Sequence, residues 1–125
     1  MNAPSCAVLI VEDDRDIRQA FAQTLAEEGY ASAQARHGRE ALDMLRRGTA
    51  PRLILLDLMM PVMDGWQFRA EQRGDPDLAT IPVVVVSADA SAEDRLVTMG
   101  VAGFLRKPVM FDDLMATVRR FCDES

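Results

Sequence analysis

The chain has 125 residues, which is enough for one domain with a single core and too few for two. Its formal net charge of −6 disfavours contact with a nucleic-acid backbone, so we expect no direct nucleic-acid binding. The apolar runs are far shorter than the roughly 20 residues that cross a bilayer, and the first residues lack a basic region. We therefore expect no membrane span and no signal peptide, and a cytoplasmic protein. Cys6 and Cys122 lack metal-type spacing and are expected to be reduced structural thiols.

Strand and helix patterns alternate along the chain. Short runs rich in branched apolar residues predict buried parallel strands, and a weaker alternating stretch takes the second place in the series, giving strands at 7–11, 30–35, 53–56, 83–86 and 104–106. Apolar residues at helical spacing predict helices between these strands and after the last one, around 17–25, 40–47, 65–73, 92–99 and 111–122. We expect Asp14 and Ser91 to cap the helices that follow them, and His37 to be an exposed loop or cap residue.

This repeated order predicts an α/β fold of the flavodoxin-like doubly wound (βα)5 type. Right-handed crossovers favour a parallel five-stranded sheet with the strand order 2-1-3-4-5. We expect a single domain over 1–125, with its core at about 6–122 and no linker. In this order Glu12 and Asp13 lie on one side of Asp57, and Ser87 and then Lys107 lie on the other.

Polar residues end four of the apolar runs, and ligands of such sheets bind at the carboxyl ends of the strands. Neighbouring carboxylates repel one another, which raises a pKa or recruits a cation, and oxygen ligands with open positions suit Mg²⁺. Asp57 is a candidate nucleophile toward phosphorus. The hydroxyl of Ser87 has the chemistry to donate to a phosphoryl oxygen. Lys107 is the sole lysine among 14 basic residues, which indicates a requirement for a compact ammonium at this position.

These residues carry a resemblance to a known family. The segment 57–65, Asp-Leu-Met-Met-Pro-Val-Met-Asp-Gly, resembles the phosphoacceptor loop of response regulator receiver domains of two-component systems. Glu12-Asp13-Asp14, Ser87-Ala88 and Lys107-Pro108 complete the family's pattern in order. The resemblance covers essentially the whole chain and is nearest to the single-domain regulators of chemotaxis. It implies a phosphorelay switch in which a sensor histidine kinase or a phosphotransfer protein phosphorylates Asp57.

The resemblance also implies roles for individual residues. Asp13, Asp57 and the backbone carbonyl of Met59 are expected to bind Mg²⁺, with Glu12 acting through a water. Lys107 is expected to contact the phosphoryl group, and its bond to Pro108 to be cis. The side chains of Met59, Met60 and Met63 are expected to serve mainly in packing.

The family's switch maps onto three further positions. Ser87 is expected to move toward the phosphoryl group, Ala88 to leave room for it, and Phe104 to swing inward; the alternative is that Phe104 is a fixed core residue. Phosphorylation is expected to change the surface of the fourth helix, fifth strand and fifth helix. That change would control the binding of a downstream protein by a monomer or a phosphorylation-dependent dimer.

Two other classes of function remain open at this point. A magnesium-dependent phosphohydrolase also forms an aspartyl phosphate, but Met59 stands where its second acid is expected, and steady turnover of a phosphate ester would distinguish it. A flavin carrier shares the fold, but residues 12–14 would repel the flavin phosphate, and a colourless protein would exclude it. The chain is expected to be a switch with no enzymatic activity on other molecules. We expect no output domain, and a stand-alone regulator in preference to a receiver excised from a larger protein.

Overall fold

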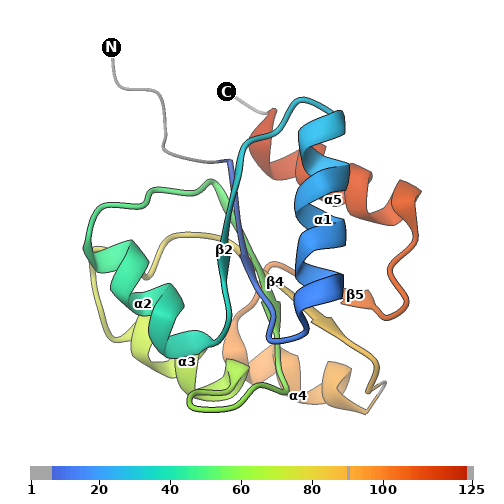
Figure 1. Cartoon of the computed structure of the whole chain (residues 1–125). Coiled ribbons are helices and arrows are strands. Elements are labelled where there is room, and N and C mark those ends of the chain that lie inside the picture. The colour runs from blue at the N-terminus through green and yellow to red at the C-terminus, as the bar shows by residue number, and fades with distance from the viewer. Residues whose placement is uncertain (1–6, 90, 124–125) are drawn as a thin grey trace.

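The computed structural model describes residues 7–89 and 91–123, which form a five-stranded parallel sheet between two layers of helices (Figure 1). The strand order is β2-β1-β3-β4-β5, as the sequence predicts. The strands are β1 (Val8–Val11), β2 (Ser32–Ala35), β3 (Leu53–Asp57), β4 (Val83–Ser87) and β5 (Gly103–Arg106). The helices are α1 (Arg15–Glu27), α2 (Gly38–Arg46), α3 (Gly65–Arg73), α4 (Ala92–Met99) and α5 (Phe111–Cys122).

The two faces of the sheet explain the continuous apolar runs. Helices α1 and α5 pack on one face, and α2, α3 and α4 pack on the other. Successive strand residues point to opposite faces, so Leu9 and Val11 enter one core cluster while Val8 and Ile10 enter the other. Because both faces are covered by helices, every residue of the central strands β1, β3 and β4 is buried. This burial holds the carboxyl ends of the strands in fixed positions.

The ends of several elements differ from the sequence predictions. Strand β2 begins at Ser32, and Tyr30 lies before it, with its hydroxyl donating to Asp123 Oδ1 at 2.7 Å. Ser91 is the N-cap residue of α4, as predicted, but its side chain accepts no hydrogen bond from the helix, and its hydroxyl donates to Asp89 Oδ1 at 2.6 Å. The predicted caps Asp14 and His37 are confirmed, since each side chain accepts a hydrogen bond from the third residue beyond it.

Two sequence expectations concern the cysteines and the membrane. Cys6 lies outside the described residues, and Cys122 is buried, with its Sγ 3.7 Å from the carbonyl oxygen of Ala7. Within residues 7–89 and 91–123, no helix has the length and apolar character that a membrane crossing requires.

Candidate phosphoryl site

The strand register brings the predicted site residues to one edge of the sheet. Val11 pairs with Leu56, so Glu12 and Asp57 follow on adjacent strands. Strand β4 lies on the other side of β3 and ends at Ser87, which pairs with Arg106 next to Lys107. The sequence predicted this convergence because the carboxyl ends of parallel strands lie on the same side of the sheet.

Three carboxylates form a compact cluster at this edge. One side-chain oxygen from each of Glu12, Asp13 and Asp57 lies within 4.8 Å of the others. Glu12 is only 2% exposed and Asp57 is 6% exposed, whereas Asp13 lies at the surface. Hard oxygen donors with one open side are the ligands that Mg²⁺ prefers, so these residues fit that ion.

Lys107 lies against both buried carboxylates. Its Nζ is 2.8 Å from Glu12 Oε1 and 3.6 Å from Asp57 Oδ2. The backbone N–H of Lys107 donates to the carbonyl of Ser87 at 3.0 Å, and the Lys107–Pro108 peptide bond is cis. The lysine side chain therefore crosses from the end of β5 to the end of β1, and its shorter contact is with Glu12.

The pKa values of the two buried acids shift in opposite directions. Burial raises the pKa of Asp57 to about 7, and the hydrogen bond and charge of Glu12 add to the rise. Burial also acts to raise the pKa of Glu12, but hydrogen bonds from Lys107 and from the Asp14 backbone N–H outweigh it and bring this pKa below its ordinary value. Glu12 is thus the ionised partner of Lys107. A cation bound beside Asp57 would lower the raised pKa of Asp57 and so favour its ionised form.

A cavity of about 360 Å³ opens over the cluster. Ser87 lies in its wall, 3% exposed, and its Oγ accepts a hydrogen bond from the Asp89 backbone N–H at 3.1 Å. Ala88 is exposed and also lines the cavity, whereas Phe104 is half-buried and packs against the core cluster on the α2, α3 and α4 face of the sheet.

The methionines of the loop after β3 behave differently from one another. Met63 is buried and Met60 packs against the core, but Met59 is 74% exposed, so its predicted packing role is wrong. The Met59 backbone N–H donates to Asp57 Oδ1 at 3.4 Å. The Met59 side chain lies at the surface, and Met59 also lines the cavity over the carboxylates.

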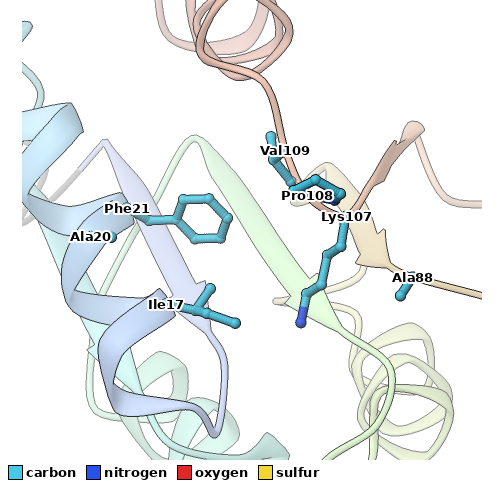
Figure 2. Close-up of a pocket in the computed structure, with 7 residues that line it drawn as sticks. All are labelled: Ile17, Ala20, Phe21, Ala88, Lys107, Pro108 and Val109. Atoms are coloured by element: carbon cyan, nitrogen blue, oxygen red, sulfur yellow. The ribbon is translucent and has the colours of Figure 1, made fainter.

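An apolar groove of about 400 Å³ adjoins the same site (Figure 2). Phe21 points from α1 toward Pro108 and Val109, and Ile17 points toward the nitrogen end of Lys107, whose side chain runs down from beside Pro108 on the opposite side of the groove. Ile17 and Phe21 belong to the apolar residues at helical spacing that predict the first helix, and such residues usually face the core, but both are only half-buried. Periodicity alone does not reveal the groove, because core-facing and groove-facing residues share one helical stripe.

Comparisons with known proteins agree with this site. Residues 8–119 match the family model described as the response regulator receiver domain. The chain is 34% identical over 117 residues to response regulator MprA of Mycobacterium tuberculosis, a match that covers 92% of the chain and 50% of MprA. This chain belongs to the response regulator receiver domain family, and it spans about half the length of the curated relatives it matches.

Solved structures show the same fold. A receiver domain of a signal transduction histidine kinase from Syntrophus aciditrophicus aligns with a TM-score of 0.83 at 36% identity, covering 93% of this chain and 89% of that one. The receiver domain of sensor histidine kinase PA1611 from Pseudomonas aeruginosa aligns at 25% identity with a TM-score of 0.83, covering 94% and 97% of the two chains. That neighbour was solved with a magnesium ion coordinated in its active-site cleft.

Proposed function

We propose that this chain is a phosphorelay switch in which Asp57 accepts a phosphoryl group from a histidine kinase or a phosphotransfer protein. The observation that carries the proposal is the position of Asp57, buried at the end of β3 between two other carboxylates and the ammonium of Lys107. Phosphoryl transfer needs positioning and neutralised charge more than covalent help, and this arrangement supplies the position and one positive charge, that of Lys107.

The transfer exchanges one bond to phosphorus for another. An Asp57 oxygen forms a bond to phosphorus while the phosphorus–nitrogen bond of a phosphohistidine breaks, and the imidazole keeps the electron pair of that bond. Lys107 neutralises charge on the phosphoryl oxygens, which requires its ammonium to turn from Glu12 Oε1 toward the new group. Asp57 must be ionised to attack, and its raised pKa makes a nearby cation important for that.

Magnesium is the cofactor that this proposal includes. Asp13, Asp57 and the backbone carbonyl of Met59 would hold the ion, and Glu12 would act through a water. When bound, the ion supplies positive charge beside Asp57 and binds phosphoryl oxygens. The carboxylate cluster and the magnesium in the PA1611 neighbour support this assignment.

Replacing Asp13 by asparagine is expected to weaken Mg²⁺ binding at least several-fold, because an anionic ligand is lost from the open side of the cluster. Fluorescence of Trp66, the one tryptophan, reports the titration, since Trp66 and Met59 line the same small cavity beside Ser87. Asp16→Asn serves as the matched control, an exposed acid of α1 that lies outside the three-carboxylate cluster. Unchanged affinity in Asp13→Asn would remove Asp13 from the site.

The switch would couple phosphorylation to a change of surface. Ser87 would turn its hydroxyl from the Asp89 N–H toward a phosphoryl oxygen, and Ala88 leaves the space for this movement. Phe104 pairs with Val85 of β4 and packs against the core cluster that α4 also enters, so we expect it to follow that movement. The surface of α4, β5 and α5 would then bind its downstream protein differently, as a monomer or as a phosphorylation-dependent dimer.

The apolar groove beside Lys107 is the surface that we assign to the phosphodonor protein. A donor helix lying between α1 and the 108–109 segment would bring its phosphohistidine to the cavity over Asp57. Val109 and Phe111 continue the apolar surface along α5, which suits the apolar face of a helix.

Phe21→Ala is expected to slow phosphoryl transfer from a histidine kinase that labels the parent chain by at least several-fold. Labelling by acetyl phosphate should stay unchanged, because a small donor does not need the groove. The comparison uses initial rates of Asp57 labelling with each donor. Equal rates for parent and variant with the kinase would contradict the assignment of the groove.

The function itself is tested with acetyl phosphate and Mg²⁺. We expect the chain to take up one phosphoryl group and then to release phosphate only as that aspartyl phosphate hydrolyses. A phosphohydrolase acting on other molecules would instead sustain rapid turnover of phosphate esters, and such turnover would overturn the proposal. Phosphate release per chain, followed over time, decides between them.

A further inference from the structure

Two arginines of α3 hydrogen-bond to the backbone at the C-terminal end of α4. Arg69 donates from Nε to the carbonyl of Met99 at 3.0 Å and from Nη2 to the carbonyl of Gly100 at 2.9 Å. Arg73 donates from Nη1 to the carbonyl of Thr98 at 2.9 Å. The last carbonyls of a helix have no partner within it, and cations favour the negative end of the helix dipole. These bonds therefore hold the end of α4 in place.

Arg69 is itself part of a buried network. It is 7% exposed, and its Nη1 donates to Gln72 Oε1 at 2.7 Å, while Gln72 Nε2 donates to the carbonyls of Leu78 and Ile81. Among the described residues, no carboxylate forms an ion pair with Arg69. A buried guanidinium is tolerated when its donors are satisfied, and here backbone carbonyls and one amide satisfy them. Moving the end of α4 would leave these donors without acceptors.

Among the described residues, no side chain of another helix hydrogen-bonds the N-terminal end of α4, although Ala92 there is buried in the core. Ser91 provides no side-chain cap, and its N–H and hydroxyl donate to Asp89. The Asp89 N–H donates to Ser87 Oγ, and the Ala92 N–H donates to the Asp89 carbonyl. Each of these bonds joins residues two or three positions apart. Midway along the helix, the guanidinium of the exposed Arg95 stacks over the half-buried ring of Trp66 of α3, 4.4 Å from the ring centre.

We propose that Arg69 and Arg73 make the C-terminal end of α4 a fixed pivot. The inference rests on the proposed function, in which Ser87 moves toward a phosphoryl group on Asp57. That movement takes away the acceptor of the Asp89 N–H, so residues 88–89 and 91–94 rearrange, while residues 98–102 keep their place against α3. The N-terminal half of α4, next to the phosphoryl site, then differs between the phosphorylated and the unphosphorylated chain. A partner protein would recognise the phosphorylated state by this half of the helix.

Amide hydrogen exchange measured with and without beryllofluoride and Mg²⁺, a mimic of the phosphoryl group, tests the pivot. In the parent chain we expect exchange rates to change several-fold in residues 88–94 and to stay unchanged in 98–102. In Arg69→Leu, which keeps the apolar volume and removes the donors, the change is expected to spread to 98–102. Arg73→Ala is expected to give a smaller spread, and because Arg73 is exposed this variant tests the same point if Arg69→Leu unfolds.

Arg52→Leu is the matched control. Arg52 Nη1 donates to the carbonyl of Cys122 at the end of α5, at 2.9 Å, so this variant removes an equivalent bond from a different helix. Its response should match that of the parent. The pivot is overturned if residues 98–102 respond as strongly as 88–94 in the parent, or if the response of both pivot variants stays confined to 88–94. A parent chain in which no segment responds to beryllofluoride would contradict the proposed function of Asp57 itself, and the pivot would fall with it.

Discussion

Replacing Lys107 by arginine is expected to preserve phosphorylation of Asp57 and to abolish the structural response to it. The carboxylate nucleophile and the acids that bind the metal remain in this variant, so labelling should persist. The Lys107 ammonium, however, occupies a small space between Glu12 Oε1 and Asp57 Oδ2, at 2.8 and 3.6 Å. A guanidinium is wider and prefers to bind two oxygens side by side. The guanidinium would therefore not fit against the oxygens of a phosphoryl group that also contacts Mg²⁺ and Ser87.

Amide exchange near Phe104, measured with and without acetyl phosphate, provides the comparison. The parent should respond to phosphorylation and Lys107→Arg should not, at equal extents of labelling. Arg106→Lys is the matched control, since it exchanges the same two residue types at an exposed neighbouring position, and its response should equal that of the parent. Equal responses in the parent and in Lys107→Arg would mean that any positive charge serves at this position.

Replacing Asp57 by asparagine is expected to stabilise the metal-free protein at pH 8. The pKa of Asp57 is raised to about 7 from an ordinary value of 3.8, so between these values the folded chain holds a proton that the unfolded chain has lost. Stability therefore falls as the pH rises through this window, and the loss is complete above about pH 7. A shift of this size corresponds to a few kcal/mol at most. The pKa of Glu12 shifts the opposite way, because its hydrogen bonds with Lys107 and the Asp14 N–H favour its ionised form.

Urea unfolding in the presence of a chelator, at pH 4.5 and pH 8, measures the effect. Parent and Asp57→Asn should differ little at pH 4.5, and the variant should be more stable at pH 8. Added Mg²⁺ should stabilise the parent more than the variant. The ion stabilises the folded chain by binding its site, and the variant lacks the carboxylate of Asp57 there. A parent that is as stable as the variant at pH 8 without metal would contradict the raised pKa.

The sequence predicted the fold and the location of the site because both depend on simple patterns. Runs such as 53–56 and 83–86 are apolar throughout, which identifies strands buried on both faces and therefore a parallel sheet. Once the strand order is known, the ends of those strands fix where Glu12, Asp57 and Ser87 lie. The start of β2 was less predictable, because the stretch from Tyr30 has only weak alternation.

Individual side-chain contacts required the structure. The sequence does not indicate that Lys107 contacts Glu12 more closely than Asp57, since that depends on the path of a long flexible side chain. Ser91 has the composition of a cap, but the nearby carboxylate of Asp89 is a stronger acceptor for its hydroxyl. Arg69 was not singled out because an arginine within a helical pattern ordinarily points to solvent, and its two carbonyl acceptors, on Met99 and Gly100, lie 30 and 31 residues further along the chain.

The identity of the phosphoacceptor is the central claim, and locating the phosphoryl group tests it most directly. The parent and Asp57→Asn are incubated with Mg²⁺ and acetyl phosphate, and the modified residue is identified by mass spectrometry of peptides after reductive trapping. The parent should carry one acid-stable, base-labile phosphoryl group on Asp57, and the variant should carry none. Labelling of Asp57→Asn to the same extent as the parent, or a phosphoryl group on a different residue of the parent, would contradict the account.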